Sequence, residues 1–260
     1  GKNGSVIDLC AEEKFNGKVS DAISFLAQEN GLIESGEIVR INKTRGILRD
    51  VADFWHSRLP KEIKNYLTAR GIREDTIDTL RVGWAENPKE YLLGKGYSME
   101  DIKESNVFQF KNRIVFPYYK NGHIVYFVGR SVEGHCSDGD NAKYKKLKMS
   151  DFVEHSIWGV DTITDKVDEV FIIEGIFEAI NCFQEGLAVL SPITPHFSKD
   201  QKKALFEILK GKHVVICFDH DPVTKSGEKS MQKLAEELLR NGINSRICTL
   251  EPPDESKKWD

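Results

Sequence analysis

Hydrophobic residues in the C-terminal part of the chain form short continuous runs, and each run is followed by apolar positions at helical spacing. The runs Val170–Ile173, Leu187–Leu190 and Val214–Phe218 have the length and the Val, Ile and Phe content of strands that are buried on both faces. A shorter fourth strand is predicted at Arg246–Leu250. Strands that alternate with helices in this way predict a small parallel sheet with right-handed crossovers.

The middle of the chain shows a different pattern, in which two β-rich segments flank a tight turn. Arg113–Tyr119 and His123–Arg130 are separated by Lys120–Gly122, and the Asn-Gly pair in this connection favours the positive φ angles of a hairpin turn. A basic run that contains one aromatic residue follows at Lys143–Lys148. The pattern therefore predicts an antiparallel hairpin with a cationic segment after it.

Helical spacing dominates the residues before this hairpin. Apolar positions predict helices over Asp50–Leu59, Lys61–Arg70 and Arg73–Leu80. A further helix is predicted to begin after Ser98, because Asp101 three residues later completes a capping box. We expect these helices to form an α+β subdomain together with the hairpin.

The first residues predict two short helices followed by a linker. Ser5 precedes one apolar-periodic segment, Ser20 is the predicted N-cap of a second helix, and Gly31 ends it. Glu34–Lys43 is polar, which indicates a linker. Two short helices cannot hold a core alone, so we expect them to be the end of a larger unit.

The composition is that of a soluble globular protein. The chain has 260 residues, of which 40% are hydrophobic and 30% charged, and this suits one large or two ordinary domains. No stretch approaches the roughly 20 apolar residues of a membrane helix, and none has the pattern of a signal peptide. The net charge is −4, so there is no overall basic signature for nucleic acid, although a groove can be positive locally.

Cysteine usage indicates a reducing compartment, and we expect a cytoplasmic protein. The five cysteines are odd in number, scattered and without CxxC spacing, so the sequence predicts neither a disulfide framework nor a set of zinc ligands. They are Cys10, Cys136, Cys182, Cys217 and Cys248.

Carboxylates follow two of the predicted parallel strands. Glu174 ends one strand and Glu178 lies about one helical turn later, whereas Asp219 and Asp221 follow the next long strand at extended-chain spacing. Ligands of open α/β sheets collect at the carboxyl ends of such strands. Oxygen-only clusters suit Mg²⁺ or Mn²⁺, so this edge is the predicted metal site. An ordinary solvated acid is the alternative for any one of these residues.

These motifs resemble those of a known family. Glu174-Gly175 followed by Asp219-x-Asp221 resembles the Toprim domain shared by DnaG-type primases, topoisomerases and some nucleases. A topoisomerase would need a separate cleavage domain with a catalytic tyrosine, for which this chain has no room. The segments whose type and order resemble bacterial and phage primases are Gly1–Leu9, Tyr66–Ala85, Asn112–Tyr119, Gly129-Arg130 and Lys143-Tyr144.

The resemblance implies an α/β fold in three parts. Residues 1–45 would be the tail of a zinc-binding domain and a linker, and residues 46–166 the α+β N-terminal subdomain of a primase catalytic core. Residues 167–260 would be the Toprim subdomain, a Rossmann-like four-stranded parallel sheet flanked by helices. Zinc would then belong only to a domain upstream of this sequence.

The resemblance also implies the activity of a DNA primase catalytic core, which makes short RNA primers on single-stranded DNA by metal-dependent nucleotidyl transfer. Two Mg²⁺ or Mn²⁺ ions are expected. Asp219, Asp221 and Glu178 are the expected metal ligands, and Glu174 is the expected general base or a second metal ligand.

Basic and aromatic residues of the primase-like segments are the expected contacts to nucleic acid and nucleotide. The resemblance implies that Arg113, Arg130 and Lys143 contact single-stranded template or triphosphate, and that Tyr144 stacks on a base. A solvated surface position for each basic residue, and a core position for Tyr144, are the alternatives.

Three features depart from the family pattern. Glu178 stands where many members have aspartate, and Lys143–Met149 is more basic and lacks an asparagine of the family motif. The third acidic segment of the family, which follows the fourth strand, corresponds to Asp260, with Asp254 as the competing candidate.

The implied partners are single-stranded DNA template, ribonucleoside triphosphates and a replicative helicase, with no membrane. The implied location is the cytoplasm of a bacterium, for a protein encoded by the host or by a phage.

Two further hypotheses stay open. One is a Toprim nuclease, or a primase-like module of a mobile element with changed activity; the other is a DNA-binding module without catalysis, such as the primase half of a helicase fusion.

Overall fold

The computed structural model describes residues 5–31, 35–132, 142–148, 153, 156–193, 196–220 and 223–249, with the backbone alone at 35–38. Contacts between residues divide the chain into two compact units, residues 1–46 and 47–260. Among the helices of the described residues, none has both the length and the apolar content needed to cross a bilayer.

The first unit contains a pair of short helices, α1 (Val6–Phe15) and α2 (Val19–Glu29). The segment after Ser5 is helical, as predicted, and Ser5 itself caps α1 and forms a capping box with Asp8. The prediction for Ser20 was wrong, because this residue lies inside α2 and its hydroxyl donates to the carboxylate of its neighbour instead of capping the helix.

Helix α3 (Ser35–Ser57) corrects the predicted linker. The segment Glu34–Lys43 is helical from Ser35 onward and continues into the predicted helix near Asp50. The C-terminal half of α3 is anchored by buried apolar side chains, including Val51 and Trp55. Extending a packed helix costs little, since each added residue forms one more hydrogen bond, and the segment has no proline to end it.

The second unit begins with a four-stranded antiparallel sheet in the order β1-β2-β3-β4. Strands β2 (Ile114–Lys120) and β3 (His123–Arg130) form the predicted hairpin, and Asn121 and Gly122 have φ angles of 52° and 73° at its turn. The outer strands β1 (Gly83–Trp84) and β4 (Tyr144–Lys146) were not predicted. They are too short to show alternation, and only pairing with the hairpin defines them.

Short helices pack around this antiparallel sheet. The capping box of Ser98 and Asp101 at the start of α7 is present as predicted. The packed centre is aromatic: the Trp55 ring lies 6.0 Å from that of Phe110 and 5.5 Å from that of Phe127, measured between centroids. The helices are α4 (Lys61–Ala69), α5 (Glu74–Thr79), α6 (Lys89–Gly94), α7 (Met99–Glu104) and the 3₁₀ turn η1 (Val107–Phe110).

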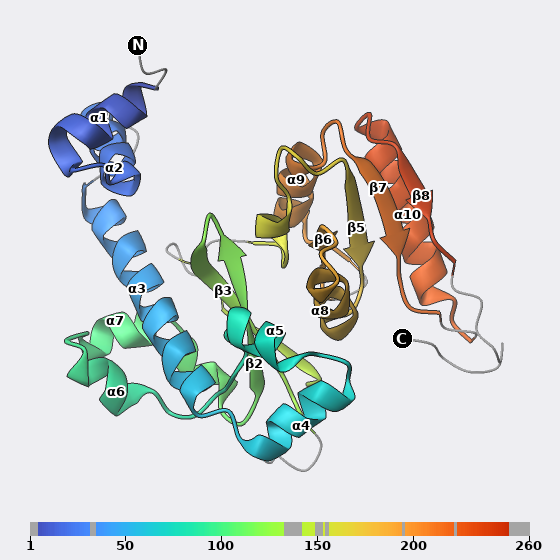
Figure 1. Cartoon of the computed structure of the whole chain (residues 1–260), viewed down its shortest axis with the longest axis horizontal. Helices are drawn as coiled ribbons and strands as arrows, with labels where there is room; N and C mark the ends of the chain where they lie inside the picture. The colour runs from blue at the N-terminus through green and yellow to red at the C-terminus, as the bar shows by residue number, and fades with distance from the viewer. Residues whose placement is uncertain are drawn as a thin grey trace. The chain divides into compact units, whose positions relative to one another are not determined.

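The C-terminal part contains the predicted parallel sheet, in the order β6-β5-β7-β8. Its strands lie side by side in Figure 1 and pair in parallel throughout. The strands are β5 (Glu169–Ile173), β6 (Val189–Leu190), β7 (His213–Cys217) and β8 (Ser245–Ile247). The fold is therefore α/β, with an α+β part before a four-stranded parallel sheet, as the sequence indicated.

Helices cover both faces of the parallel sheet. Helices α9 (Lys199–Ile208) and α10 (Ser226–Arg240) pack against Val170 and Ile172 of β5 on one face. The other face of β5, which includes Ile173, packs with α8 (Ile176–Gln184). A further 3₁₀ turn, η2 (Val160–Thr162), precedes β5.

Helix α8 belongs to the core of both parts of the second unit. Its Ile176, Phe177 and Ile180 are buried in the same apolar cluster as Phe116 and Phe127 of the antiparallel sheet. Helix α8 is thus the element through which the two sheets share one core.

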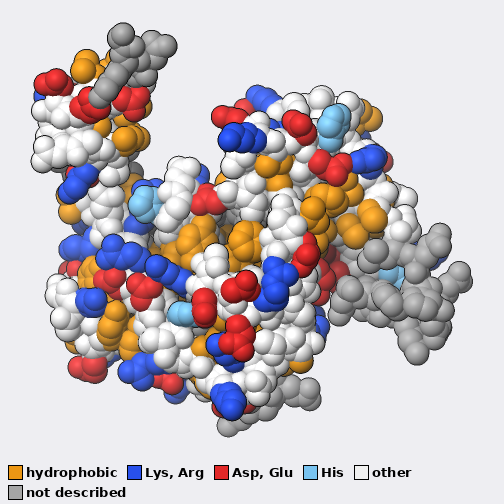
Figure 2. Space-filling model, in the orientation of Figure 1, with side chains coloured by type: hydrophobic (Ala, Val, Ile, Leu, Met, Phe, Trp, Pro, Cys, Tyr) orange, Lys and Arg blue, Asp and Glu red, His pale blue; other side chains and the backbone are white. Residues whose placement is uncertain are grey.

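On the surface shown in Figure 2, acidic and basic side chains are interspersed, which agrees with the small net charge of −4.

Candidate active site

A small cavity of about 90 Å³ gathers side chains of opposite charge from both sheets, and we call it the charged pocket. Its acidic residues come from the carboxyl ends of β5 and β7, which are hydrogen-bonded neighbours. The lining residues are Arg70, Arg130, Lys143, Tyr144, Glu174, Gly175, Phe177, Glu178, Ile193 and Asp219.

Two of the acids come from the turn between β5 and α8. Glu174 directly follows β5, Gly175 is the N-cap of α8, and Glu178 lies in the first turn of that helix. A Cβ atom at Gly175 would lie 1.9 Å from Glu178 Oε2. Glycine therefore leaves the Glu178 carboxylate free to turn back toward Glu174 beside the helix N-terminus, where negative charge is favoured.

Asp219 follows β7 and is held close to the start of α10. A Cβ atom at Gly227 would lie 2.0 Å from the Asp219 carbonyl oxygen, so only glycine permits this approach of two backbones. His220 does not line the pocket: its Nδ1 lies 2.8 Å from Glu228 Oε1 on α10. Asp221 lies outside the described residues.

The antiparallel sheet and α4 contribute the basic side chains and Tyr144 to the pocket, and we call these residues its basic wall. Arg130 ends β3 and is only 8% exposed; its guanidinium carbon lies 4.5 Å from the ring centre of Phe177. Nη1 of Arg130 donates to the hydroxyl of Tyr144. Nε of Arg130 is buried and has no hydrogen-bond partner within the part of the chain that the structure describes. An unpaired buried donor is costly, so this atom is suited to an anionic ligand.

Tyr144 and Lys143 come from the start of β4. Lys143 Nζ lies 5.7 Å from the ring centre of Tyr144. Burial raises the pKa of the Tyr144 phenol, and the nearby Arg130 opposes this shift. The phenol therefore stays neutral at physiological pH, and its hydroxyl accepts a hydrogen bond from Arg130.

Arg70 is a pocket residue that the sequence analysis did not single out. It caps the C-terminus of α4, its side chain is exposed, and its guanidinium carbon lies 5.3 Å from the ring centre of Phe177. The Arg70-Gly71 pair within the primase-like segment Tyr66–Ala85 was the available signal. Nothing in local spacing indicates that this helix end reaches the carboxylates.

Arg113, in contrast, does not line the charged pocket. It is 2% exposed, and its Nη1 donates to the backbone carbonyl of Ala142 at 2.8 Å. The buried guanidinium supports the chain just before Lys143 and so acts on the pocket from outside it. The direct contact of Arg113 with template or triphosphate stays a prediction, and any such contact would lie outside the charged pocket.

The three carboxylates suit a hard divalent cation because their donors are all oxygens on one wall of one pocket. Within the described ranges, no three His, Cys, Asp or Glu side chains converge closely enough to form a complete metal site. Two of the predicted ligands, Asp221 and Asp260, and the competing candidate Asp254 lie outside the described residues. Glu174, Glu178 and Asp219 are the predicted ligands that the fold brings to one place.

A parallel sheet that presents carboxylates at its carboxyl edge, preceded by an α+β part that supplies cations, is the arrangement that the resemblance to a Toprim-containing primase core implied. Residues 53–152 match the family model of the DNA primase catalytic core, N-terminal domain, and residues 171–260 match the Toprim-like family model. The two matches follow each other in the order of a primase core. The chain belongs to the DnaG-type primase family, as a part of its catalytic core.

Curated relatives agree with this assignment. The DNA primase of Staphylococcus epidermidis is 25% identical over 237 residues, which cover 81% of this chain and 39% of that protein. The DNA primase of Lactococcus lactis is 25% identical over 293 residues, which cover 100% of this chain and 44% of that protein. The chain therefore spans less than half the length of these two primases.

Solved structures show the same fold. The zinc-binding and RNA polymerase domains of the Aquifex aeolicus primase align with a TM-score of 0.69 at 22% identity, over 97% of this chain and 66% of that one. The RNA polymerase domain of the Mycobacterium tuberculosis primase DnaG aligns with a TM-score of 0.70 at 15% identity, over 83% of this chain and 77% of that one. A DnaG primase catalytic domain bound to single-stranded DNA aligns with a TM-score of 0.64 at 18% identity, over 83% of this chain and 73% of that one.

Proposed function

We propose that this chain is the nucleotidyl-transfer core of a primase, which joins ribonucleotides into short RNA primers on single-stranded DNA. The observation that carries the proposal is the charged pocket: three carboxylates line the same pocket as a buried arginine whose Nε has no hydrogen-bond partner among the described residues. Carboxylates suit metal ions and guanidinium groups suit phosphates, and a metal-bound triphosphate is a ligand that needs both.

The acidic wall is the proposed metal site. The Toprim family implies the use of a divalent metal, and we propose two Mg²⁺ or Mn²⁺ ions held by Glu174, Glu178 and Asp219, with Asp221 and Asp260 as further ligands. Bound there, the metal would lower the free energy of the negative charge that develops during phosphoryl transfer. Glu174 is the proposed general base or second metal ligand.

The basic wall is the proposed triphosphate site. Arg130 offers its buried Nε, which has no partner among the described residues. The exposed cations of Lys143 and Arg70 complete the basic side of the pocket. Charge-assisted hydrogen bonds to phosphate are about twice as strong as neutral ones. Tyr144 stays in place through its contact with Arg130, and its ring is the proposed platform on which a base stacks.

The proposed partners follow from the family. Because a related DnaG catalytic domain has been solved with single-stranded DNA, we propose single-stranded DNA as the template of this chain. Ribonucleoside triphosphates are the proposed substrates and a replicative helicase is the proposed partner protein. The proposed place of action is the bacterial cytoplasm, and residues 1–45 are proposed to continue from a zinc-binding domain.

The test is primer synthesis on single-stranded DNA with labelled ribonucleotides and Mg²⁺ or Mn²⁺. We expect short RNA products with the wild-type chain, and none with Asp219→Ala, because this change removes a metal ligand without adding bulk. Glu207→Gln is the matched control: it removes an exposed carboxylate on α9 that forms an ion pair with its helix neighbour Lys210. Products that persist in Asp219→Ala would contradict the proposal.

A Toprim nuclease is the second candidate, and Glu178 favours it, because the family more often has an aspartate at this position. The same reaction mixtures distinguish the two. DNA fragments without RNA products, lost again in Asp219→Ala, would support the nuclease. DNA binding without either product, unchanged by metal, would support a module that binds without catalysis.

A further inference from the structure

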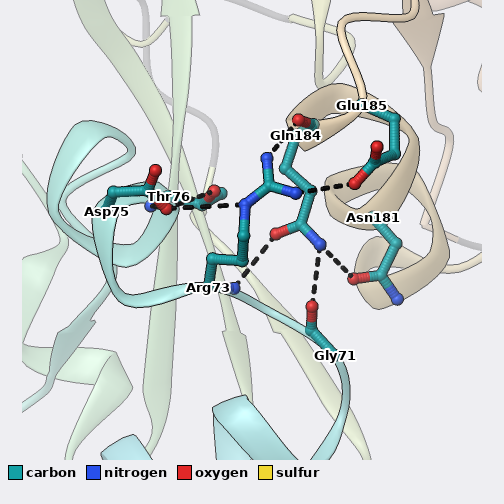
Figure 3. A network of polar contacts seen from close by, with 7 residues as sticks. All are labelled: Gly71, Arg73, Asp75, Thr76, Asn181, Gln184 and Glu185. Atoms are coloured by element: carbon teal, nitrogen blue, oxygen red, sulfur yellow. Dashed lines mark hydrogen bonds and ion pairs between the residues drawn. The ribbon is translucent and has the colours of Figure 1, made fainter.

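The turn between α4 and α5 is hydrogen-bonded to the C-terminal half of α8, and Figure 3 shows most of these contacts. Asn181 Nδ2 donates to the carbonyl oxygen of Arg70 at 3.2 Å, and Gln184 Nε2 donates to that of Gly71 at 2.7 Å. The backbone N–H of Arg73 donates to Gln184 Oε1 at 3.0 Å. Both ends of one glutamine amide are thus paired with the same turn. We call this set of contacts the α8 network.

An ion pair extends the network at its exposed edge. Arg73 Nη1 lies 2.6 Å from Glu185 Oε1, and Nη2 donates to the backbone carbonyl of Gln184. The Arg73 and Glu185 side chains are 47% and 66% exposed, so their attraction is screened by water and contributes little. The half-buried Gln184 and Asn181 are therefore the members of the network that hold the turn.

The backbone of the turn lies close against α8. Gly71 has a φ of +85°, and a Cβ atom there would lie 3.3 Å from Asn181 Oδ1. Ile72 beyond it is 1% exposed. The turn is therefore packed closely against α8, and Arg70 stands at the start of that turn.

The same helix carries the acids of the charged pocket. Glu178 lies in the first turn of α8, and Glu174 precedes its N-cap. Phe177 of α8 packs beneath the Arg70 guanidinium. Helix α8 therefore contacts Arg70 twice: the Asn181 side chain bonds the Arg70 main chain, and the Phe177 ring packs against the Arg70 guanidinium.

We infer that Asn181 and Gln184 are positioning residues for Arg70. They fix its main chain on α8, so that the guanidinium faces the carboxylates of the same helix across the pocket and binds the phosphates of a nucleoside triphosphate. An arginine side chain has much rotamer freedom, and a fixed main chain leaves less of it to be lost on binding. The inference rests on the proposed function, because it takes a triphosphate as the ligand of the charged pocket.

The test measures binding of inorganic triphosphate with Mn²⁺ to the 260-residue chain by calorimetry, without catalysis. We expect Arg70→Ala and Gln184→Met each to weaken binding about tenfold. The double variant should bind no more weakly than Arg70→Ala alone, because a residue that acts through Arg70 has nothing to position once that side chain is gone. Unchanged binding by Gln184→Met, or additive losses in the double variant, would overturn the inference.

Two further variants keep the result specific. Lys64→Met is the matched control: it breaks an exposed ion pair with Glu74 that joins α4 to α5 without involving α8, and should leave the affinity unchanged. If thermal unfolding shows that Gln184→Met does not fold, the Gln184→Glu variant takes its place in the binding test. It keeps an acceptor for the Arg73 N–H but places a second oxygen opposite the Gly71 carbonyl, and should weaken binding in the same non-additive way.

The primer assay separates this inference from the proposed function. If triphosphate binding depends on Arg70 and Gln184 in this non-additive way but the chain makes no primers, the proposed function is contradicted and the inference is supported. Primers from a chain whose triphosphate binding does not depend on Arg70 would contradict the inference alone.

Discussion

The two sheets of the second unit supply opposite walls of one pocket, and they do so by different means. The parallel sheet presents Glu174 and Asp219 within two residues of the ends of neighbouring strands, so its topology brings them together. The antiparallel part presents Arg130 at a strand end, Lys143 beside an edge strand and Arg70 at a helix end. Its cations converge only because each of these elements packs against α8 or its neighbours.

The two parts also differ in what they bury. All seven tyrosines of the chain precede residue 145, and most of them lie in or near the antiparallel core. The face of the parallel sheet that packs against α9 and α10 is mainly aliphatic, with Val170, Ile172 and Ile216 at its centre. The aromatic part combines packing with hydroxyl groups that hydrogen-bond to backbone and to Arg130.

The largest expected effect compares the two walls through activity. We expect Glu174→Gln to lower the kcat of primer synthesis by about 100-fold or more, as loss of a catalytic carboxylate does. Arg130→Gln should mainly raise the KM for ribonucleotide, by about tenfold, since it would remove the proposed charged contact to phosphate, worth about 1.5–3 kcal/mol at most. Steady-state kinetics on a fixed template checks both.

An Arg130→Lys variant is the control for charge, because lysine keeps the cation but loses the planar fork. If Glu174→Gln changed only KM, or Arg130→Gln only kcat, the assignment of metal to one wall and phosphate to the other would be wrong.

The second comparison concerns backbone contacts. Gly227→Ala should lower the free energy of unfolding by about 1–3 kcal/mol, because the new methyl group would meet the Asp219 carbonyl. Gly122→Ala in the hairpin meets no atom within 4 Å and should cost only about 1 kcal/mol, for its φ of +73°. Urea unfolding measures both values.

Gly94→Ala serves as the control, since it meets no atom and has no positive φ. Equal losses for Gly227→Ala and Gly122→Ala would show that Asp219 is not held against α10 as described.

The smallest expected effect is the pH dependence of the antiparallel part. Burial raises the pKa of Tyr119 and of Tyr126 to about 12, whereas an unfolded tyrosine has a pKa of about 10. The folded chain then keeps protons that the unfolded chain loses, so this stability is complete below about pH 10 and is lost as the pH rises toward 12. Thermal unfolding followed between these pH values, with tyrosinate absorbance, measures the loss.

Tyr126→Phe should flatten this dependence, although it also removes the hydrogen bond to the Leu147 carbonyl and so lowers stability at neutral pH. Full tyrosinate formation at pH 10 in a chain that remains folded would contradict the buried positions of these phenols.

Much of the parallel half could be predicted from the sequence, because its signals are local. Continuous apolar runs marked the strands, and the acids after Val170–Ile173 and Val214–Phe218 marked the edge of the sheet. The Asn-Gly turn marked the hairpin for the same reason. The linker predicted over Glu34–Lys43 was wrong, because a polar segment can be helical when it extends a helix that is packed further along.

The roles of the arginines depended on contacts between residues far apart in the chain. Sequence patterns treated Arg113 and Arg130 alike, yet one is buried against Ala142 and the other faces the carboxylates. Arg70 was passed over, because the residues that hydrogen-bond its turn, Asn181 and Gln184, lie more than 100 residues away. The sequence determined which chemistry each segment carries, since strand and turn propensities and residue types are local. Only the tertiary structure decided which cations meet the acids, because that depends on how α8 packs between the two sheets.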